Sequence, residues 1–508
     1  MLGRVKNNNM RRVLVLILGM VICLSGCTMI PKYSQPKAPV ADQWPSGAAY
    51  LKAQPKVKVS DVTQMRWQEF FTDSKLQRII KMALDNNRDL RLAVLNVEKA
   101  RALYGVQRAK LLPVVNLEGG QAKQRYSSDF VSPGASRTIN QYSVDLGITA
   151  WEIDFFGRIR SLKEQALQDY LGTQEARRSA QITLVSEVAR VYLTIAADRA
   201  NLNLARSTLE AQRSAYNLVL RRYKVKIAQE IDLRRAQTQV DTAMVNVMSY
   251  IQQEAQDQNA LDLLAGSLVP EDLLPSDLTG VSPLMDIYPG LSSEVLFRRP
   301  DIMAVEHQLK GAYANIGAAR AAFFPSISLT TTLGSASNEF SGLFKAGKGT
   351  WTYAPQVVMP IFDARTWAAY RVSQADRKIA LTQYEKVIQT AFKEVADVLA
   401  VKGTVDQQIA SQQSMVDSAE KVYLLSNKRY TNGIDNYLSV LDAQRSLYGA
   451  EQGLITMQLT KLINEVRIYA VLGGGAKEDS NERGPVSRDS FEDNVLSLLG
   501  SKLIKSEH

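Results

Sequence analysis

Two stretches of the chain carry apolar residues at every seventh position, the spacing that is typical of coiled coils. The first stretch has no glycine or proline from residue 173 to 265, and its row consists of Val188, Ile195, Leu202, Leu209, Tyr216 and Tyr223. The second row, interrupted at Lys402, consists of Val395, Ile409, Val416, Tyr423 and Tyr430. A single helix over the first stretch would be roughly 140 Å long. We therefore expect two hairpins with arms of about 60 residues, or roughly 90 Å, turning within 223–232 and 430–439.

Two shorter segments, 142–150 and 326–334, alternate between apolar and polar residues, which is the period of a strand with one apolar face. In the first of them the apolar face is expected to hold Tyr142, Val144, Leu146, Ile148 and Ala150. Less regular partner strands are predicted near 114–125 and 351–360. Segments rich in serine and glycine, at 127–138 and 334–350, are predicted to be the connecting loops.

Four strands with an apolar face raise the question of what covers that face. In a bilayer, the edges of an open sheet would leave backbone groups without hydrogen bonds, and closed outer-membrane barrels start at eight strands. Strands would then have to be pooled, either from two chains or from three. The alternative is a sheet in water that packs on the helices, since antiparallel sheets in soluble proteins also alternate.

The chain also repeats itself. Residues 87–90 recur at 299–302, an offset of 212, and residues 187–189 recur at 394–396, an offset of 207. The pair Arg222-Tyr223 recurs as Arg429-Tyr430, again 207 residues later. Two constant offsets that change once, in the strand region, indicate a duplication with one change of loop length. Each copy is predicted to contain a helix, two strands and a long helical hairpin.

The N-terminus has the features of a secretory signal. Basic residues precede an apolar run at 13–24 that is too short to cross a bilayer as a permanent helix. The run ends in Leu24-Ser25-Gly26-Cys27, which resembles the bacterial lipobox, so we expect cleavage after residue 26 and acylation of Cys27. Thr28 favours the outer membrane over retention at the inner membrane. The alternative is ordinary cleavage, with Cys27 an incidental residue.

Composition excludes several classes of function. The formal net charge is +10, of which the signal contributes four, and the remaining basic residues are mixed with acids along the helical patterns. That mixture is typical of solvated helix faces and gives no nucleic-acid footprint. The chain has only two histidines, His307 and His508, and no glycine-rich phosphate loop or zinc-protease motif. We therefore expect no enzymatic activity, no cofactor and no metal site.

These patterns divide the chain into five parts. Residues 1–26 are the predicted signal peptide, and 27–75 form a lipid-anchored N-terminal segment. The first repeat is expected over 76–285 and the second over 286–475. Residues 476–508 are charged and poor in aromatic residues, and we expect a polar, flexible tail.

Several motifs, in order along this duplicated chain, resemble one known family. They are Trp67-Gln68-Glu69-Phe70-Phe71, Trp151-Glu152-Ile153-Asp154-Phe155-Phe156-Gly157-Arg158, Arg298-Arg299-Pro300-Asp301-Ile302, Arg320-Ala321-Ala322-Phe323-Phe324-Pro325 and Leu441-Asp442-Ala443-Gln444-Arg445. The chain is similar to the outer-membrane factors of tripartite efflux pumps of the resistance-nodulation-division (RND) type, the TolC/OprM-like and NodT-type lipoproteins. The similarity extends over nearly all of the mature chain, to about residue 475.

The resemblance implies a mainly α-helical trimer in the cell outer membrane. Each protomer would supply four transmembrane strands to a twelve-stranded β-barrel and two coiled-coil hairpins to a periplasmic tunnel of twelve helices. The implied function is a passive exit duct for drugs or other small molecules. The implied partners are a periplasmic membrane-fusion adaptor and an inner-membrane RND transporter, with outer-membrane lipid around the barrel.

The resemblance also implies a gate at the periplasmic helix tips. Tyr430 matches the gate tyrosine, Asp442 an aspartate of the pore-narrowing ring, and Asp232 the bonded aspartate of the neighbouring hairpin. Ser439 stands where some members have a second aspartate, and Asp435 stands at the place of the gate arginine. The alternative for these residues is structural, with Tyr430 filling the heptad row and Asp442 on a solvated face.

Residues near the two turns would face the adaptor, namely Arg222, Lys226, Ile227, Arg429 and Gly433. Lys226 stands where the second copy has Gly433 and the family usually has glycine. Two rival functions stay open on the sequence. One is a duct of the same architecture for type I protein secretion, and the other is a coiled-coil lipoprotein without a pore.

Overall fold

A computed structural model describes residues 28–50, 66–278 and 293–474, and shows a mainly helical chain with one four-stranded sheet. The chain forms two compact units. One takes residues up to 42 together with 88–181 and 296–393, and the other takes the remaining segments. The long helices α5 (Arg158–Lys224) and α8 (Ala364–Thr431) each run from the first unit into the second. Each unit therefore contains parts of both predicted repeats, whose boundaries remain a prediction.

The order of elements repeats along the chain, as the duplication predicts. The first series is α4 (Arg88–Ala109), β1 (Val115–Arg125), β2 (Thr138–Ile153), α5 and α6 (Glu230–Ala265). The second is α7 (Pro300–Ala321), β3 (Ser326–Ser337), β4 (Gly349–Val358), α8 and α9 (Tyr437–Val471). Proline begins α7, where its missing N–H costs nothing. Two further helices, α2 (Trp67–Phe70) and α3 (Ser74–Asn86), precede the first series.

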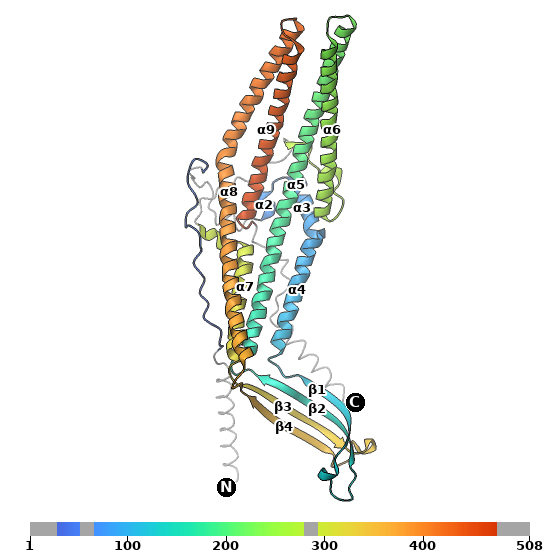
Figure 1. The fold of residues 1–508 in the computed structure, drawn as a ribbon, viewed down its shortest axis with the longest axis vertical. Helices are drawn as coiled ribbons and strands as arrows, with labels where there is room; N and C mark the ends of the chain where they lie inside the picture. The colour runs from blue at the N-terminus through green and yellow to red at the C-terminus, as the bar shows by residue number, and fades with distance from the viewer. Residues whose placement is uncertain (1–27, 51–65, 279–292, 475–508) are drawn as a thin grey trace. The chain divides into compact units, whose positions relative to one another are not determined.

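In the first unit, the four strands form one antiparallel sheet in the order β1-β2-β3-β4 (Figure 1). The predicted strands are therefore confirmed, including the two with irregular patterns. The loops lie where they were predicted, each with a short 3₁₀ turn, at Ser128–Phe130 and Phe340–Gly342. The second loop is shorter than predicted, because β3 continues to Ser337 and β4 begins at Gly349. Because strands pair in chain order, β1 and β4 are the edges of the sheet within one chain.

In the second unit, most of the first heptad row lies between helices, as a coiled coil predicts, whereas Tyr223 at the end of the row is 38% exposed. Val188 and Ile195 are fully buried, and Leu202 and Leu209 pack against α6 through Ala243 and Val247. The arms, however, are unequal. α5 and α8 have 67 and 68 residues, whereas α6 and α9 have 36 and 35, so the expectation of arms of about 60 residues was wrong for the returning helices.

An aromatic cluster forms another part of the core of the second unit. Phe70 and Phe71 of the α2 region are fully buried, and their rings lie 4.8 and 5.4 Å from that of Tyr469 on α9. Beside them, the Asp73 carboxylate caps α3 by accepting from two backbone N–H groups, and it also accepts a 3.1 Å hydrogen bond from the Tyr192 hydroxyl. The Trp-Gln-Glu-Phe-Phe motif therefore anchors the N-terminal segment to the hairpins.

Candidate functional site: the sheet and the hairpin tips

One face of the sheet is apolar and exposed. Leu117, Leu146, Leu333 and Trp351 form a row across all four strands, and between 52% and 76% of each side chain is exposed. The next row on this face holds Val115, Ile148, Thr331 and Tyr353. An apolar patch of this extent in a single chain marks a surface that meets lipid or another protein. Basic residues of β1 appear on this face near its loop end, at Lys123 and Arg125.

The opposite face is polar. Its central row holds Glu118, Asp145, Gly334 and Thr350, each paired with the next across neighbouring strands. The remaining positions of this face in the paired register are mainly small or polar, among them Asn116, Gly120, Ser143, Gly147, Ser328, Thr330, Thr332, Thr352 and Gln356. The sheet thus has one apolar and one polar face.

A β-bulge in β2 keeps the two faces separate. Ile148 pairs with Thr331 and Trp151 pairs with Leu329, so between these two pairs β2 has one more residue than β3. Ala150 lies in this bulge with φ +53°, and its N–H donates to Thr330 Oγ1 at 3.0 Å. The expectation that Ala150 continues the apolar face was therefore wrong. Because the bulge shifts the alternation by one residue, Trp151 falls on the apolar face and Glu152 on the polar face.

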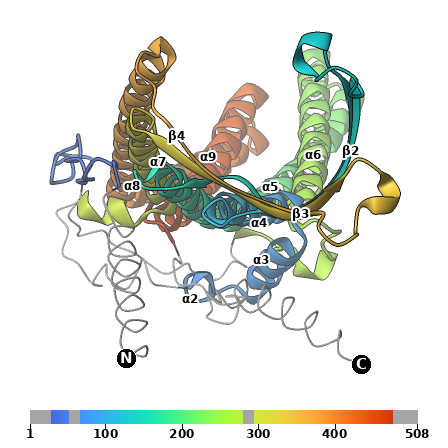
Figure 2. The same cartoon turned by 90° about the horizontal axis from the view of Figure 1, so that it is seen from below.

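The sheet curves toward its polar face. A Cβ atom added at Gly147 or Gly334 would fall within 3.0 Å of backbone atoms of the adjacent strand. Both glycines lie on the polar face, so the neighbouring strand bends over that side at this point. Figure 2 shows the strands as an arc rather than a flat layer. The polar face is concave and the apolar face convex.

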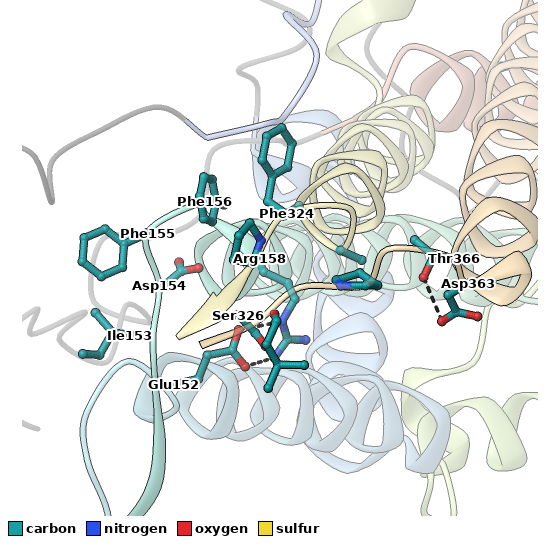
Figure 3. Close-up of a pocket in the computed structure, with 15 residues that line it drawn as sticks. Glu152, Ile153, Asp154, Phe155, Phe156, Arg158, Phe324, Ser326, Asp363 and Thr366 are labelled. Carbon is teal, nitrogen blue, oxygen red and sulfur yellow. Dashed lines mark hydrogen bonds and ion pairs between the residues drawn. The ribbon is translucent and has the colours of Figure 1, made fainter. Parts of the chain in front are cut away.

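At the junction of sheet and helices, aspartates start both long helices (Figure 3). The Asp154 carboxylate accepts hydrogen bonds from the backbone N–H groups of Ile159 and Arg160, at 3.1 and 2.8 Å. Glu152, at the end of β2, forms an ion pair with Arg158 in which Nε donates at 2.8 Å. These contacts fix the direction in which α5 leaves the sheet.

The second copy repeats this junction. Asp363 accepts from the backbone N–H of Arg365 at 2.9 Å and from the Thr366 hydroxyl at 3.2 Å. Between the two junctions lies a cavity of about 340 Å³, and the stacked rings of Phe156 and Phe324, 4.9 Å apart, form part of its wall. Its aspartates are occupied by helix capping, so we assign the cavity a structural role.

At the other ends of the long helices, the two turns have the same backbone. The carbonyl of Arg222 accepts from the N–H groups of Ile227 and Ala228, at 2.8 and 3.2 Å. The carbonyl of Arg429, 207 residues later, accepts from the N–H groups of Ile434 and Asp435, at 2.9 and 3.4 Å. Lys226 and Gly433, which correspond at this offset, both have positive φ, +61° and +75°. The second copy therefore uses glycine where the first holds a lysine in a left-handed conformation.

An aromatic and cationic cluster joins the two turns. The Arg222 guanidinium lies 4.8 Å from the centre of the Tyr430 ring, and its Nη2 lies 3.5 Å from the carbonyl oxygen of Thr431. The Tyr430 ring lies 5.2 Å from that of Tyr437, the first residue of α9. Tyr437 also packs against the buried Val219 of α5. The structure thus brings the predicted Tyr430 together with Arg222 of the other hairpin.

Tyr437 is a residue of this cluster that the sequence interpretation missed. It is 3% exposed, and its hydroxyl has no hydrogen-bond partner among the described residues. Burial raises the pKa of Tyr437 to about 12, with smaller contributions from Tyr430, Tyr423 and Asp232. An aromatic residue directly after an asparagine that can cap a helix was the signal available in the sequence.

The other predicted gate residues lie around this cluster. Asp232 is half-buried and close enough to Tyr437 for an electrostatic effect, whereas Asp442 is exposed. Ser439 donates its backbone N–H to the Asn436 side chain at 3.2 Å and so takes part in the cap of α9. Asp435 forms a 2.6 Å ion pair with Arg429 across the second turn. Within one chain, the charge of Asp435, which stands at the place of the gate arginine, is therefore neutralised by Arg429.

The predicted lipidation site, Cys27, lies outside the described residues. The segment that follows it is held against α7 in the first unit. The Tyr33 hydroxyl donates to Glu306 at 3.0 Å, its ring lies 5.5 Å from that of Tyr313, and Lys310 Nζ lies 5.2 Å from the ring centre. These contacts fix the chain soon after its predicted mature N-terminus.

Other chemistry is sparse in the described part of the chain. No cluster of three potential metal ligands occurs there, and none of its helices is long and apolar enough to span a membrane. His307 Nδ1 contacts the Gln168 side-chain oxygen at 2.7 Å on half-buried surface between α7 and α5. This histidine therefore has a packing role that accounts for its position.

Comparison with known proteins gives consistent matches over most of the chain. The family model described as "Outer membrane efflux protein" matches residues 79–267 and 291–474. The "Probable efflux pump outer membrane protein TtgC" of Pseudomonas putida is 45% identical over 462 residues, which cover 90% of this chain and 95% of that protein. A solved membrane protein from Pseudomonas aeruginosa is 39% identical, with a TM-score of 0.82, and the match covers 88% of this chain and 98% of that one. The open state of the Neisseria gonorrhoeae MtrE outer membrane channel is 35% identical with a TM-score of 0.78, covering 89% and 99%.

Proposed function

This chain belongs to the outer membrane efflux protein family, and from that premise we propose that it is the exit duct of a tripartite efflux pump in the cell outer membrane. A duct of this kind catalyses no reaction, and energy for transport comes from an inner-membrane transporter. The relative TtgC is named for an efflux pump, which favours efflux of small molecules over type I protein secretion. Drugs and other small molecules are the proposed cargo.

The observation that carries this proposal is the open sheet with an exposed, convex apolar face. A row such as Leu117, Leu146, Leu333 and Trp351 fits acyl chains, and the concave polar face fits a water-filled lumen. The edge strands β1 and β4 are free to pair with other copies. Three copies then close a barrel of twelve strands, and their hairpins form a periplasmic tunnel of twelve helices. The same trimer is supported by α4, which has no buried residue in one chain.

We assign the closure of the tunnel to the cluster at the hairpin tips. Arg222 lies over the Tyr430 ring and so links the two hairpins, with Tyr437 buried beneath them and Asp232 nearby. Asp442 is exposed in one chain, as a residue of a charged ring around a pore must be. The pair Arg429–Asp435 and the Ser439 backbone stabilise the second turn.

The proposed partners follow from the place of these residues. A periplasmic membrane-fusion adaptor would contact the turns, where Lys226, Ile227 and Gly433 are exposed, and would connect the duct to an RND transporter. We also propose that Cys27 is acylated and that Tyr33 holds the anchored segment on α7. A Cys27→Ala protein exported through another signal should still form trimers with at least partial efflux. Complete loss of trimers would show that the anchor is needed for assembly.

The test of the duct uses the purified protein in detergent. Electron microscopy should show threefold particles, and reconstitution into planar bilayers should give single-channel conductance. Asp442→Ala should raise that conductance, while Asp406→Ala, an exposed acid paired with Lys461 on the same hairpin, serves as a matched control. Particles without threefold symmetry, together with silent bilayers, would refute the duct and favour a coiled-coil lipoprotein without a pore.

A further inference from the structure

The basic side chains of the sheet all lie in one place. On the four described strands, only Lys123 and Arg125 are lysine or arginine. Both belong to the register rows of the apolar face, where they pair with Asn140 and Thr138 of β2. They point to the same side of β1 and are separated by roughly 7 Å along the strand. The apolar face therefore ends, at its loop end, in a pair of adjacent positive charges.

This charge is not neutralised within the described chain. Lys123 and Arg125 are exposed, and neither forms an ion pair with a described carboxylate. The β1–β2 and β3–β4 loops lie at the same end of the sheet (Figure 1). Together with these loops, this end carries five basic and two acidic residues, namely Lys123, Arg125, Arg137, Lys345 and Lys348 against Asp129 and Glu339. The loop end of the sheet is therefore positively charged.

The height of the basic pair on the sheet fits the headgroup layer of a membrane. On β2, the apolar face extends from Ile153 to Tyr142. Without the bulge residue this is a length of roughly 33 Å along the strand. A strand tilt of about 35–45° reduces it to roughly 25 Å, the height of the apolar band of an outer-membrane barrel. Lys123 and Arg125 lie beyond Tyr142, where the acyl chains of a bilayer would end.

An aromatic contact independently indicates a membrane boundary at this level. The ring of Tyr142 lies 5.8 Å from that of Phe340 in the β3–β4 loop, and its hydroxyl accepts a 3.1 Å hydrogen bond from Gln121. Phe340 and Phe344 are 74% and 81% exposed. Aromatic side chains of this kind form girdles where a barrel passes from lipid to water. The basic pair lies just outside this girdle.

We propose that Lys123 and Arg125 form a binding site for the phosphate groups of lipopolysaccharide, at the outer rim of the apolar face. The proposal rests on the proposed outer-membrane barrel, in which the loop end of the sheet, opposite the helices, reaches the outer leaflet. Lipopolysaccharide is the anionic glycolipid of that leaflet, and its phosphates are attached to the sugars that carry the acyl chains. The Arg125 guanidinium can hold a phosphate through two hydrogen bonds, and the Lys123 ammonium adds a second charge.

In the proposed barrel, the site also lies where two copies of the chain meet. Strand β1 is an edge of the sheet, so it would pair with β4 of the next copy. The β3–β4 loop of that copy would bring Lys345 and Lys348 to the same rim. A glycolipid that binds there favours the assembled barrel, because a ligand stabilises the state that binds it.

Native mass spectrometry of the full-length protein, in a detergent solution without divalent cations, tests the proposal. Bisphosphorylated lipid A, the acylated and phosphorylated part of lipopolysaccharide, is titrated into the protein and the retained copies are counted. Parallel titrations use dephosphorylated lipid A and phosphatidylglycerol, an anionic phospholipid without a sugar backbone. Bisphosphorylated lipid A should bind more tightly than either of the other lipids.

Variants assign this binding to the basic pair. Lys123→Gln combined with Arg125→Gln should weaken the binding of lipid A by about tenfold or more, since each base at a membrane surface contributes a factor of about five. Exchanging the two residues, Lys123→Arg with Arg125→Lys, keeps both charges and should bind more tightly than the glutamine variant. Arg206→Gln with Lys421→Gln is the matched control, because it removes the same charge from exposed positions on α5 and α8. It should bind lipid A as the wild type does.

The results that overturn the site differ from those that overturn the duct. Equal binding of lipid A by wild type and glutamine variant, or equal affinity of wild type for lipid A and phosphatidylglycerol, refutes the site. If the glutamine variant does not assemble, each single variant should give a partial decrease, and unchanged binding refutes the site. Threefold particles and conductance are measured on the same preparation and do not require lipid A. If both are absent, the apolar face does not meet lipid, and the site fails with the barrel.

Discussion

The left-handed residue in each hairpin turn gives a quantitative prediction. Lys226 has φ +61° and Gly433 has φ +75° at corresponding places in the duplicated chain. A left-handed conformation costs a residue with a Cβ atom roughly 1–2 kcal/mol, and glycine avoids this cost but loses more entropy on folding, about 0.5–1 kcal/mol. Lys226→Gly should therefore stabilise the first turn by up to about 1 kcal/mol, and Gly433→Lys should destabilise the second by a similar amount.

At the second turn, the free-energy cost of the backbone angle can be measured without a steric contribution. A Cβ atom added at Gly433 would meet no atom within 4 Å, so steric contact contributes nothing to the cost of Gly433→Lys. Because the Gly433 site has no neighbouring atom for a new Cβ to meet, the two changes should add, and the protein that carries both should have nearly the original total stability.

Hydrogen exchange of the detergent-solubilised protein is the assay. The relevant amides are those bonded to the Arg222 carbonyl, from Ile227 and Ala228, and their counterparts at Ile434 and Asp435. A change of about 1 kcal/mol corresponds to roughly fivefold in the protection of these amides. Faster exchange in Lys226→Gly, or no change in Gly433→Lys, would refute the assignment of strain to the backbone angle.

Three further predictions concern other positions. Ala150→Gly should relieve the positive φ in the bulge and raise the free energy of unfolding in urea by about 1 kcal/mol or less, whereas Ala150→Val should lower it. Tyr437→Phe removes a buried hydroxyl that has no hydrogen-bond partner in the described part of the chain, and it should be neutral or stabilising by up to about 1 kcal/mol in thermal unfolding. A large loss of stability would reveal a hydrogen-bond partner. Burial beside Asp257 raises the pKa of Asp198 to about 7 from 3.8. The stability that comes from its proton is present below pH 4 and is lost as the pH rises through 7, so Asp198→Asn should melt above wild type at pH 8 and nearly with it at pH 4.

The sequence was sufficient for the elements that have a regular period. Strict alternation placed β2 and β3, and the heptad row placed the buried Val188, Ile195 and Leu202 correctly. Strand β1 was harder to predict because Gly119 and Gly120 interrupt its alternation, and its register depends on pairing with β2. A local pattern carries no information about such a partner.

Two errors have specific physical causes. Alternation alone cannot show a bulge, because the extra residue becomes visible only when Ile148 and Trp151 are paired with β3. The returning arms are shorter than expected because the heptad row does not show where a helix ends, and α6 stops at Ala265, before Gly266 with φ +69°. The long helix α5, in contrast, begins at Arg158, ahead of the Gly172 that bounds the stretch without glycine. Gly172 lies inside the helix, where a Cβ atom would stand 3.4–3.5 Å from Ala304 and His307 of α7. Close packing between the helices accounts for a glycine that looked like a breaker.

The candidate site was predicted only in part. The duplication and the family resemblance indicated Tyr430, Asp232 and Asp442 as site residues. They did not predict that Arg222 lies over the Tyr430 ring. That contact joins residues 208 positions apart on different hairpins, and tertiary packing alone creates it. The turns themselves were predicted well, because Asn432-Gly433 is a local signal.

The open edges of the sheet also bear on how the protein is made. A newly exported chain presents the unpaired hydrogen-bonding groups of β1 and β4, together with an apolar face whose leucines and tryptophan are more than half exposed. Exposed edges and apolar surface of this kind promote aggregation. In the proposed trimer, folding of the sheet is coupled to association with two further copies and a bilayer, so the yield of native protein should depend on chain concentration during biogenesis. An unassembled subunit is a short-lived species that chaperones must shield.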